Sequence, residues 1–214
     1  MTRFLGYHET RFAYDERREL LWKTLCSSYF QQLIPEEACV LELGAGYGHF
    51  INNIRCRHKV AVDIWDGMFE YLSPDVEGHI GNATDLSQVV DNSVDFVFAS
   101  NFFEHLTQQD FSIILKQLRL KLRPGGTLNI LQPNFRFAFR EYFDDYTHIS
   151  IYTERSITDF LAFNGFNVIE CKPRFLPLTL KSRIPVSPFL ISLYLALPFK
   201  PMGKQMFLRA KVDG

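Results

Sequence analysis

Three glycines lie close together directly after a short apolar run. The run covers residues 38–43, and Gly44, Gly46 and Gly48 follow it. Glycines in such a turn let the backbone approach a ligand closely and direct its amide groups toward that ligand. Asp63 ends the next apolar run, 19 residues after Gly44, where a carboxylate can accept hydrogen bonds from the two hydroxyls of a ribose. These residues together predict a site for a ligand that contains a nucleoside.

A nicotinamide or flavin site is the alternative for a glycine-rich turn, and its fingerprint is G-x-G-x-x-G. Gly44 and Gly46 fit that fingerprint, but His49 occupies the third glycine position. A side chain there obstructs the close packing of helix on strand that the third glycine permits. The G-K-[ST] sequence of a nucleoside triphosphate site is also absent. The dinucleotide interpretation is therefore not favoured.

Two further groups of polar residues could act as acids or bases. His148 and Asp145 lie in the segment REYFDDYTHIS, which is rich in polar and aromatic residues. We favour His148 because an unperturbed imidazole titrates near neutral pH. Glu104 and His105 form a second pair in NFFEHL, although they could simply satisfy backbone hydrogen bonds where the chain enters a helix.

The N-terminal residues Tyr7 and Arg11 could form a lid over the ligand, although core packing and surface pairing account for them more simply. No metal site is expected, because His49, His58 and His79 have no neighbours in the sequence with metal-ligand spacing.

Hydrophobic periodicity predicts strands that alternate with helices. This pattern predicts an α/β fold, doubly wound, with a mostly parallel seven-stranded sheet, an antiparallel last strand and helices on both faces. The expected strands are residues 38–43, 59–63, 77–80, 94–99, 127–131, 166–174 and 205–212. The expected helices are residues 8–33, 50–54, 85–90, 107–122 and 153–164.

Five segments, in this order, carry a resemblance to a known family. They are ELGAGYG (residues 42–48), AVDI (61–64), GNATDL (81–86), FVFASNFFEHL (96–106) and LRPGGTLNILQPN (122–134). Over residues 38–131, and more loosely elsewhere, the chain resembles the class I S-adenosylmethionine-dependent methyltransferases. The resemblance implies S-adenosylmethionine as the cofactor and a Rossmann-like fold. The overall pattern is also loosely similar to bacterial members associated with cell-surface sugars.

The resemblance assigns the glycine turn to the methionine part of the cofactor. Gly44, Ala45, Gly46 and Gly48 would form the turn beneath it, and Glu42 would orient its amino group.

The same resemblance assigns the adenosine part to the residues that follow. Asp63 would hold the ribose hydroxyls, while Ile64 and Trp65 would pack on the adenine. Asn82 and Ala83 would read the adenine edge. The family more often has Asp at the position of Asn82, but an amide oxygen can still accept a hydrogen bond from the exocyclic amine.

Ser100 and Asn101 would face the methyl donor, and residues 132–150 would form one wall of the acceptor pocket. His148 and Asp145 lie within that wall, which makes them the candidate catalytic residues.

Composition places the chain among globular proteins. It has 214 residues, of which 47% are hydrophobic and 22% charged, which excludes disordered, collagen-like and disulfide-scaffold classes. We expect one domain, with an N-terminal helical cap (1–36), a core (37–175) and an apolar, basic segment with the last strand (176–214). The four cysteines form no C-x-x-C, the N-terminus is too charged for a signal peptide, and no run is long enough to span a membrane. These features predict a cytoplasmic protein.

The C-terminal part has an uneven charge. Residues 172–211 contain eight basic side chains and no acidic one, whereas residues 1–170 contain 15 basic and 23 acidic ones. The apolar stretch FLISLYLAL lies within this basic part, and it is either a buried helix or a surface that rests on the inner face of the membrane through residues 185–204. An exposed stretch would also provide a contact for a homodimer.

Two functions remain open from the sequence. The first is methyl transfer to a small-molecule acceptor, lipid-linked or phosphorylated, with O-methylation of a sugar or lipid-linked glycan favoured over N-methylation. The second is a catalytically silent S-adenosylmethionine-binding regulator or assembly partner. Nucleic acid is not the expected acceptor, because the basic residues are dispersed and no N-P-P-[YFW] sequence is present.

Overall fold

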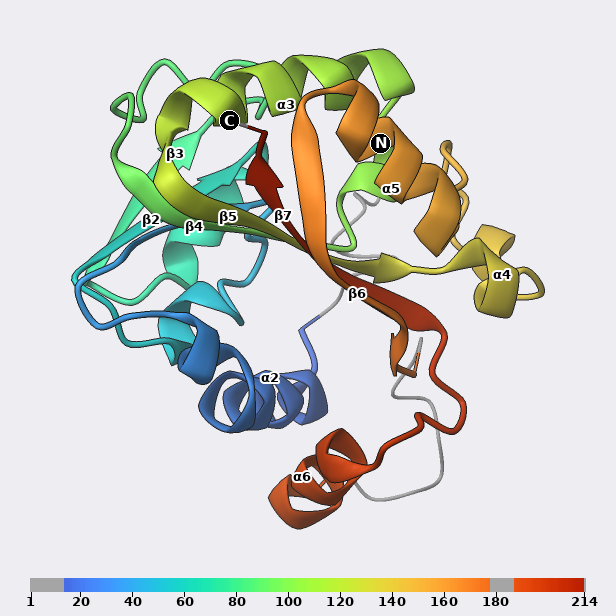
Figure 1. The fold of residues 1–214 in the computed structure, drawn as a ribbon. Coiled ribbons are helices and arrows are strands. Elements are labelled where there is room, and N and C mark those ends of the chain that lie inside the picture. Colours follow the sequence, from blue (N-terminus) through green and yellow to red (C-terminus); the bar gives the residue numbers. More distant parts are fainter. Residues whose placement is uncertain (1–13, 178–186, 214) are drawn as a thin grey trace, which may run out of the picture.

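The computed structural model describes residues 14–177 and 187–213 of the chain. Seven strands form one sheet in the order β3-β2-β1-β4-β5-β7-β6 (Figure 1). The first five strands pair in parallel, and β7 is antiparallel to both β5 and β6. The strands are β1 (Cys39–Leu43), β2 (His58–Asp63), β3 (Val76–Ile80), β4 (Val94–Ser100), β5 (Leu122–Pro133), β6 (Phe166–Leu176) and β7 (Gln205–Val212). The predicted fold class is confirmed.

Helices cover both faces of the sheet. In Figure 1, α3 and α5 lie on one face, and α2 and α6 lie on the other. The α-helices are α2 (Glu16–Ser28), α3 (Gln108–Lys121), α4 (Phe135–Ala138), α5 (Glu154–Phe163) and α6 (Pro188–Ala196). The short 3-10 helices are η1 (Phe30–Leu33), η2 (Ile51–Asn53), η3 (Asp66–Glu70), η4 (Phe103–His105) and η5 (Tyr142–Asp144).

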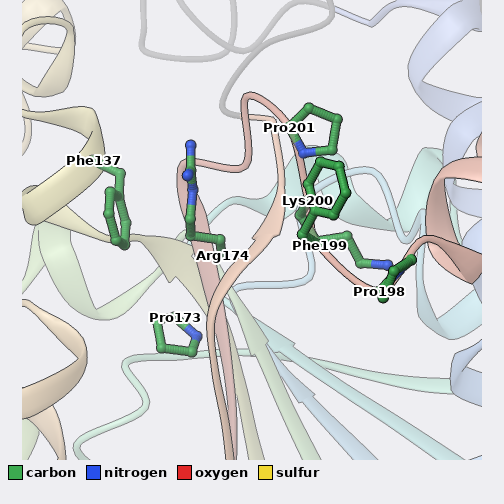
Figure 2. A pocket seen from close by; sticks show the side chains of 7 residues that line it. All are labelled: Phe137, Pro173, Arg174, Pro198, Phe199, Lys200 and Pro201. Carbon is green, nitrogen blue, oxygen red and sulfur yellow. The ribbon is translucent and has the colours of Figure 1, made fainter.

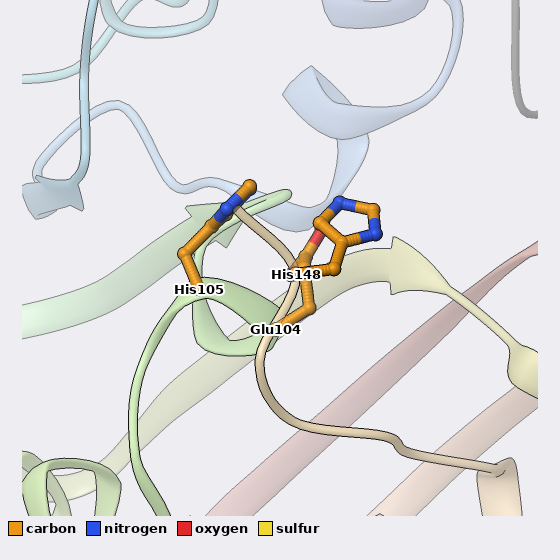
Figure 3. Close-up of side chains that lie close together, drawn as sticks. All are labelled: Glu104, His105 and His148. Carbon is orange, nitrogen blue, oxygen red and sulfur yellow. The ribbon is translucent and has the colours of Figure 1, made fainter. Parts of the chain in front are cut away.

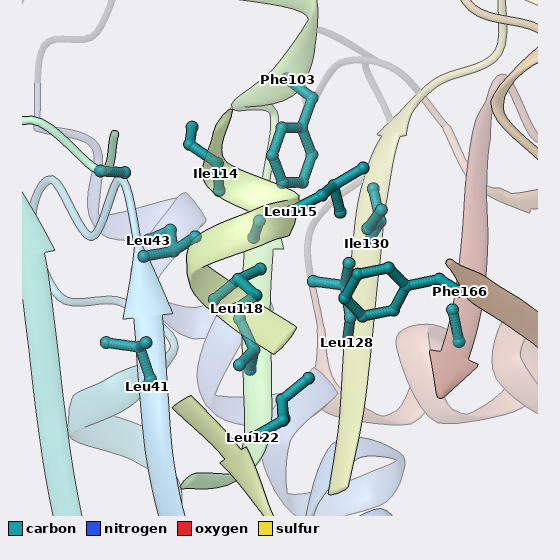
Figure 4. Close-up of a cluster of buried hydrophobic side chains, with 14 of the residues drawn as sticks. Leu41, Leu43, Phe103, Ile114, Leu115, Leu118, Leu122, Leu128, Ile130 and Phe166 are labelled. Atoms are coloured by element: carbon teal, nitrogen blue, oxygen red, sulfur yellow. The ribbon is translucent and has the colours of Figure 1, made fainter. Parts of the chain in front are cut away.

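The core on the α3 face is built from alternate strand residues, because successive side chains of a strand point to opposite faces. Leu41 and Leu43 of β1 point toward α3, whose Ile114, Leu115 and Leu118 are fully buried against the sheet (Figure 4). Helix α3 begins where the sequence predicts, since the Thr107 hydroxyl accepts a hydrogen bond from the Asp110 amide at 3.1 Å.

The core on the α2 face is aromatic. The rings of Phe50 and Phe98 stack with centroids 3.9 Å apart, and Phe30 packs edge-on against both. Helix α6 lies against α2, where the hydroxyls of Ser28 and Ser192 are 3.2 Å apart. Both faces are thereby closed, which leaves the carboxyl ends of the parallel strands as the place for a ligand.

Two predicted helical segments differ from the structure. Residues 50–54 contain the 3-10 helix η2 (Ile51–Asn53) and no α-helix, and the Ile51 amide donates to the Glu42 carboxylate. Residues 85–90 form turns, since the Asp85 carboxylate accepts a hydrogen bond from the Ser87 amide at 3.0 Å. Such local side-chain bonds compete with helix formation.

Other boundaries shift. Of the predicted helix 8–33, the described part forms α2 and then η1, and residues 8–13 lie outside the described residues. Strand β5 is longer than expected and begins at Leu122, because that residue already pairs with Val94 before the register shifts at the glycines.

Candidate active site

The glycine turn follows β1 and lies at the point where the strand order reverses. Gly44, Gly46 and Gly48 have φ angles of +67°, +52° and +66°, a region that L side chains rarely adopt. A Cβ at Gly44 would also lie 2.5 Å from the Phe102 ring. Glycine is therefore required here both by backbone conformation and by the close approach of the segment after β4.

Glu42 lies beneath this turn. Its side chain is buried, one carboxylate oxygen accepts a hydrogen bond from the Ile51 amide at 3.0 Å, and burial raises its pKa well above the usual value. The carboxylate thus fixes the chain on both sides of the glycines. Its predicted contact with the cofactor's amino group stays a prediction.

Asp63 ends β2 beside the same turn. Its two carboxylate oxygens accept hydrogen bonds from the amides of Gly46 at 2.8 Å and Trp65 at 2.9 Å. Each carboxylate oxygen can accept more than one hydrogen bond, so the side chain holds the turn and can still receive a ribose hydroxyl. Ile64, predicted to pack on adenine, is 75% exposed next to it.

An aromatic cluster that the sequence analysis did not anticipate lies around this region. The Tyr47 ring packs edge-on against Trp65 and Tyr71, with centroids 5.2 and 4.6 Å apart. The Tyr14 ring stacks on Tyr71. The only signal in the sequence is the aromatic residue inside the glycine turn, because the other rings come from separate segments.

Asn82 and Ala83 follow β3. Ala83 is buried, and Asn82 is exposed with its amide oxygen accepting a hydrogen bond from the Thr84 amide at 3.0 Å. That bond orients the Asn82 side chain at the carboxyl end of the sheet.

Ser100 and Asn101 end β4, and Asn101 has a φ of +48°. Its amide oxygen accepts a hydrogen bond from the Gln205 side chain at 2.9 Å, and its amide nitrogen lies 3.3 Å from the Ser100 hydroxyl. Gln205 begins β7, so the antiparallel strand supports the segment predicted to face the methyl donor. A strained, well-supported residue of this kind is frequent at functional sites.

Glu104 lies two residues beyond the ring that touches Gly44. Its side chain is completely buried, and burial raises its pKa to about 8. Its main-chain carbonyl accepts hydrogen bonds from the amides of Ile149 and Ser150, but its carboxylate accepts none from the described residues. The backbone role considered for this residue thus accounts for its main chain and not for its side chain.

His148 lies opposite Glu104. Its Nδ1 donates to the Tyr142 carbonyl at 2.6 Å, and its Nε2 is 4.0 Å from Glu104 Oε1. Figure 3 shows the side chains of Glu104, His105 and His148 close together, two from η4 and one from the loop after η5.

Asp145 reaches this group through Thr147. The Thr147 hydroxyl donates to Asp145 at 2.6 Å and lies 2.9 Å from His105 Nδ1. The structure therefore brings His148, Asp145, Glu104 and His105 into one polar cluster. Tyr7 and Arg11 lie outside the described residues.

A hollow of about 510 Å³ lies beside the carboxyl end of β5. Asn134, the residue after that strand, donates to the Pro173 carbonyl at the rim of the hollow. The Arg174 guanidinium lies 4.8 Å above the Phe137 ring. The lining residues, drawn in Figure 2, are Phe137, Pro173, Arg174, Pro198, Phe199, Lys200 and Pro201. The hollow is mostly apolar, with two basic side chains.

Comparisons with known proteins agree with this arrangement. The profile of the family described as "Methyltransferase domain" matches residues 14–171. The chain is 32% identical over 163 residues to a malonyl-[acyl-carrier protein] O-methyltransferase of Methylococcus capsulatus, a match that covers 68% of this chain and 58% of that protein. The chain therefore spans less than two thirds of this curated relative.

Solved structures share the fold. A S-adenosylmethionine-dependent methyltransferase from Archaeoglobus fulgidus superposes with a TM-score of 0.69 at 21% identity, covering 96% of this chain and 97% of that one. A putative methyltransferase from Haloferax volcanii, solved in complex with an activator, gives a TM-score of 0.69 at 15% identity, covering 93% and 92%.

Proposed function

Because the chain belongs to the methyltransferase domain family, we propose that it transfers the methyl group of S-adenosylmethionine to an oxygen of a small-molecule acceptor. S-adenosylmethionine is the cofactor that this family implies. The described residues fit it, since Gly44, Gly46 and Gly48 form a turn of positive φ without side chains at the carboxyl end of β1, and Asp63 presents a carboxylate beside it.

One observation carries the proposal. The Phe102 ring touches the glycine turn, and the polar cluster of Glu104, His105 and His148 begins two residues later. The cofactor site and a group that can bind an acceptor oxygen therefore adjoin each other. An oxygen acceptor benefits from such polar groups within hydrogen-bond reach.

The bound cofactor supplies the reactive methyl group, and the protein positions the acceptor and excludes water. In this proposal His148 is the catalytic residue, because its Nε2 faces the Glu104 carboxylate in the cluster that would bind the acceptor oxygen. Asp145, predicted as its catalytic partner, bonds to Thr147 and through it to His105. We therefore assign Asp145 a positioning role.

For the acceptor we propose a sugar or lipid-linked glycan that carries a phosphate. Support comes from the apolar hollow beside β5, where the Arg174 guanidinium brings positive charge next to Phe137. The Methylococcus capsulatus relative is named for O-methylation of a carrier-bound malonyl group. A carrier-bound carboxylate is therefore the second acceptor class to test, since it also offers an anionic oxygen.

We further propose a cytoplasmic protein that contacts the inner face of the membrane through residues 185–204, of which 185 and 186 lie outside the described residues. The part of this segment that the structure describes contains α6, and its exposed apolar side chains support the proposal. The same surface would serve as the contact of a homodimer. Vesicle binding tests for the membrane contact, and sedimentation velocity tests for the dimer.

The first experiment is a calorimetric titration of the purified chain with S-adenosylmethionine, with NAD as the control ligand. We expect saturable binding of S-adenosylmethionine alone. Preference for NAD would contradict the assignment of the glycine turn.

The second experiment tests catalysis with His148→Asn. With nucleotide-linked sugars, lipid-linked sugars and carrier-bound acyl groups as acceptors, we expect a methylated product whose formation falls at least about a hundredfold in the variant. S-adenosylmethionine binding should stay unchanged. Cofactor binding without turnover on any acceptor would instead favour a silent binding protein.

A further inference from the structure

Two chain segments bring three potential metal ligands together at the carboxyl end of β4. One ligand atom from each of Glu104, His105 and His148 lies within 4.8 Å of the other two. We propose that these three side chains bind a divalent transition-metal ion, which holds the acceptor oxygen next to the methyl donor. This inference rests on the proposed methyl transfer and names the device that positions its acceptor.

The Glu104 side chain is the first argument. It is completely buried, and neither carboxylate oxygen accepts a hydrogen bond from the described residues. A buried carboxyl group without hydrogen bonds is unfavourable, and buried charges are normally paired or bound to metals. A cation between Glu104 and the two imidazoles supplies the missing partner.

The orientation of the two imidazoles is the second argument. His148 Nδ1 lies 2.6 Å from the Tyr142 carbonyl, and His105 Nδ1 lies 3.3 Å from the Thr147 carbonyl. Because a carbonyl only accepts, both rings carry their proton on Nδ1 and keep the lone pair on Nε2. Metal-binding histidines are typically held in this way by a carbonyl or carboxylate behind the ring.

The support behind His105 extends one step further. The Thr147 hydroxyl donates to Asp145 and therefore receives the His105 Nδ1–H at 2.9 Å. Asp145 thus fixes the ring of a ligand that it does not itself touch. Asp145 is half-buried within the cluster, as this indirect role requires.

The donor set indicates the kind of ion. One carboxylate and two imidazoles suit Mn²⁺, Fe²⁺, Co²⁺ or Zn²⁺, and three protein ligands leave positions open for the acceptor. Ligands about 2.1 Å from such an ion lie roughly 3 to 3.5 Å apart. The three ligand atoms lie within 4.8 Å of one another, with His148 Nε2 4.0 Å from Glu104 Oε1, so ion binding requires the side chains to rotate toward one another. Both histidines are partly exposed, which gives the ion a route from solvent.

The experiment is a calorimetric titration of the chelator-treated full chain with MnCl₂, CoCl₂ and ZnCl₂, in the absence of S-adenosylmethionine. We expect one ion per chain, with affinity reduced about tenfold or more in Glu104→Gln and in His148→Asn, because even the support of a ligand is worth about that factor. Bound Co²⁺ should also give a visible absorption band that these variants lose.

His79→Asn is the matched control. His79 forms an exposed pair with Glu77, which also contacts His58, so the surface offers a second Glu and His group outside the proposed site. The proposal predicts unchanged binding in this variant. Binding that is lost in His79→Asn and kept in Glu104→Gln would overturn it.

S-adenosylmethionine titrations on the same samples separate this inference from the proposed function. If the unsubstituted chain binds S-adenosylmethionine and none of the three ions, the metal site is refuted while the methyl transfer proposal stands. If treatment with a chelator leaves the rate of methyl transfer unchanged, the metal site is likewise refuted and the methyl transfer proposal stands. If the chain binds an ion but no S-adenosylmethionine, the proposed function fails and the metal site stands.

Discussion

Asp63 links the cofactor site to the fold at the scale of single residues. Its carboxylate receives the amides of Gly46 and Trp65, from the turns after β1 and β2. Polar groups that are fixed before the ligand arrives lose little freedom on binding. In the proposed function the side chain would therefore serve the turn and the ribose at once.

Replacing Asp63 should weaken cofactor binding. We expect Asp63→Ala to lower the affinity for S-adenosylmethionine about 30-fold, because hydrogen bonds to a charged acceptor contribute about 1.5–3 kcal/mol. Asp63→Asn, which keeps one acceptor oxygen, should have a smaller effect. Calorimetry is the measurement, with the exposed Asp66→Ala as control. Unchanged affinity in Asp63→Ala would contradict the placement of the ribose.

His49 predicts a pH dependence of stability. Its ring is buried, its Nε2 makes no hydrogen bond to the described residues, and burial followed by the nearby Arg18 lowers its pKa from 6.5 to about 4. Between these values the unfolded chain binds a proton that the folded chain does not. This residue's contribution is therefore intact above pH 6.5 and is lost as the pH falls toward 4.

We expect His49→Phe to keep the ring and remove that pH dependence. The fall in the free energy of unfolding between pH 7 and pH 5 should be smaller in the variant by about 2 kcal/mol, as the two pKa values require. Urea unfolding at both pH values measures it. An equal fall in both proteins would contradict this prediction, because it would show that His49 has the same pKa in the folded and unfolded states.

At the scale of elements, the loop after β1 and the segment after β4 are fitted to each other. The Phe102 ring occupies the space where a Cβ at Gly44 would lie, 2.5 Å away. Glycine at this position is therefore needed for the approach of two elements as well as for the turn itself.

Gly44→Ala and Gly125→Ala separate these two causes. Both glycines have positive φ, but a Cβ at Gly125 would meet nothing within 4 Å. Gly125→Ala should cost about 1–2 kcal/mol from backbone strain, and Gly44→Ala about 1–3 kcal/mol more from the clash. Thermal and urea unfolding provide the values. Phe102→Ala in the Gly44→Ala background should recover part of the excess, and equal costs for the two glycines would argue against the contact.

At the scale of the whole molecule, α6 has two different sides. Ile191, Tyr194 and Leu195 pack on the core cluster of the α2 face, whereas Phe189 and Leu193 are 74% and 50% exposed. Among the described helices, none combines the length and apolar character needed to cross a bilayer. The exposed apolar side suits the proposed contact with a membrane surface.

Vesicle binding tests this contact. We expect the chain to sediment with vesicles containing phosphatidylglycerol and to bind phosphatidylcholine vesicles more weakly. The double variant Phe189→Ser and Leu193→Ser should reduce binding about tenfold or more, because each buried side chain contributes about 1.5–3 kcal/mol. Phe163→Ser is the control, since that ring is 87% exposed on α5, on the opposite face of the sheet. Equal loss in the control would refute the membrane surface.

The sequence by itself determined the sheet, the family and the cofactor. The strand patterns, the glycine turn and the acid after the second strand are local signals, because a buried strand and a tight turn depend mainly on neighbouring residues. The helical segments expected at residues 50–54 and 85–90 form a 3-10 helix and turns instead, and in the second the Asp85 side chain accepts a hydrogen bond from the Ser87 amide. The periodicity of apolar residues does not register such competition.

Only the tertiary structure decided the acceptor side. The sequence placed Glu104 and His148 in separate candidate pairs and indicated no metal site, because no short spacing connects them. Folding brings η4 and the loop after η5 to the same end of the sheet, where the Glu104 carboxylate is buried facing His148 at 4.0 Å. The contacts of Gln205 with Asn101 and of Phe102 with Gly44 arise in the same way. Such contacts join residues far apart in the chain, so they depend on the packing of the whole sheet.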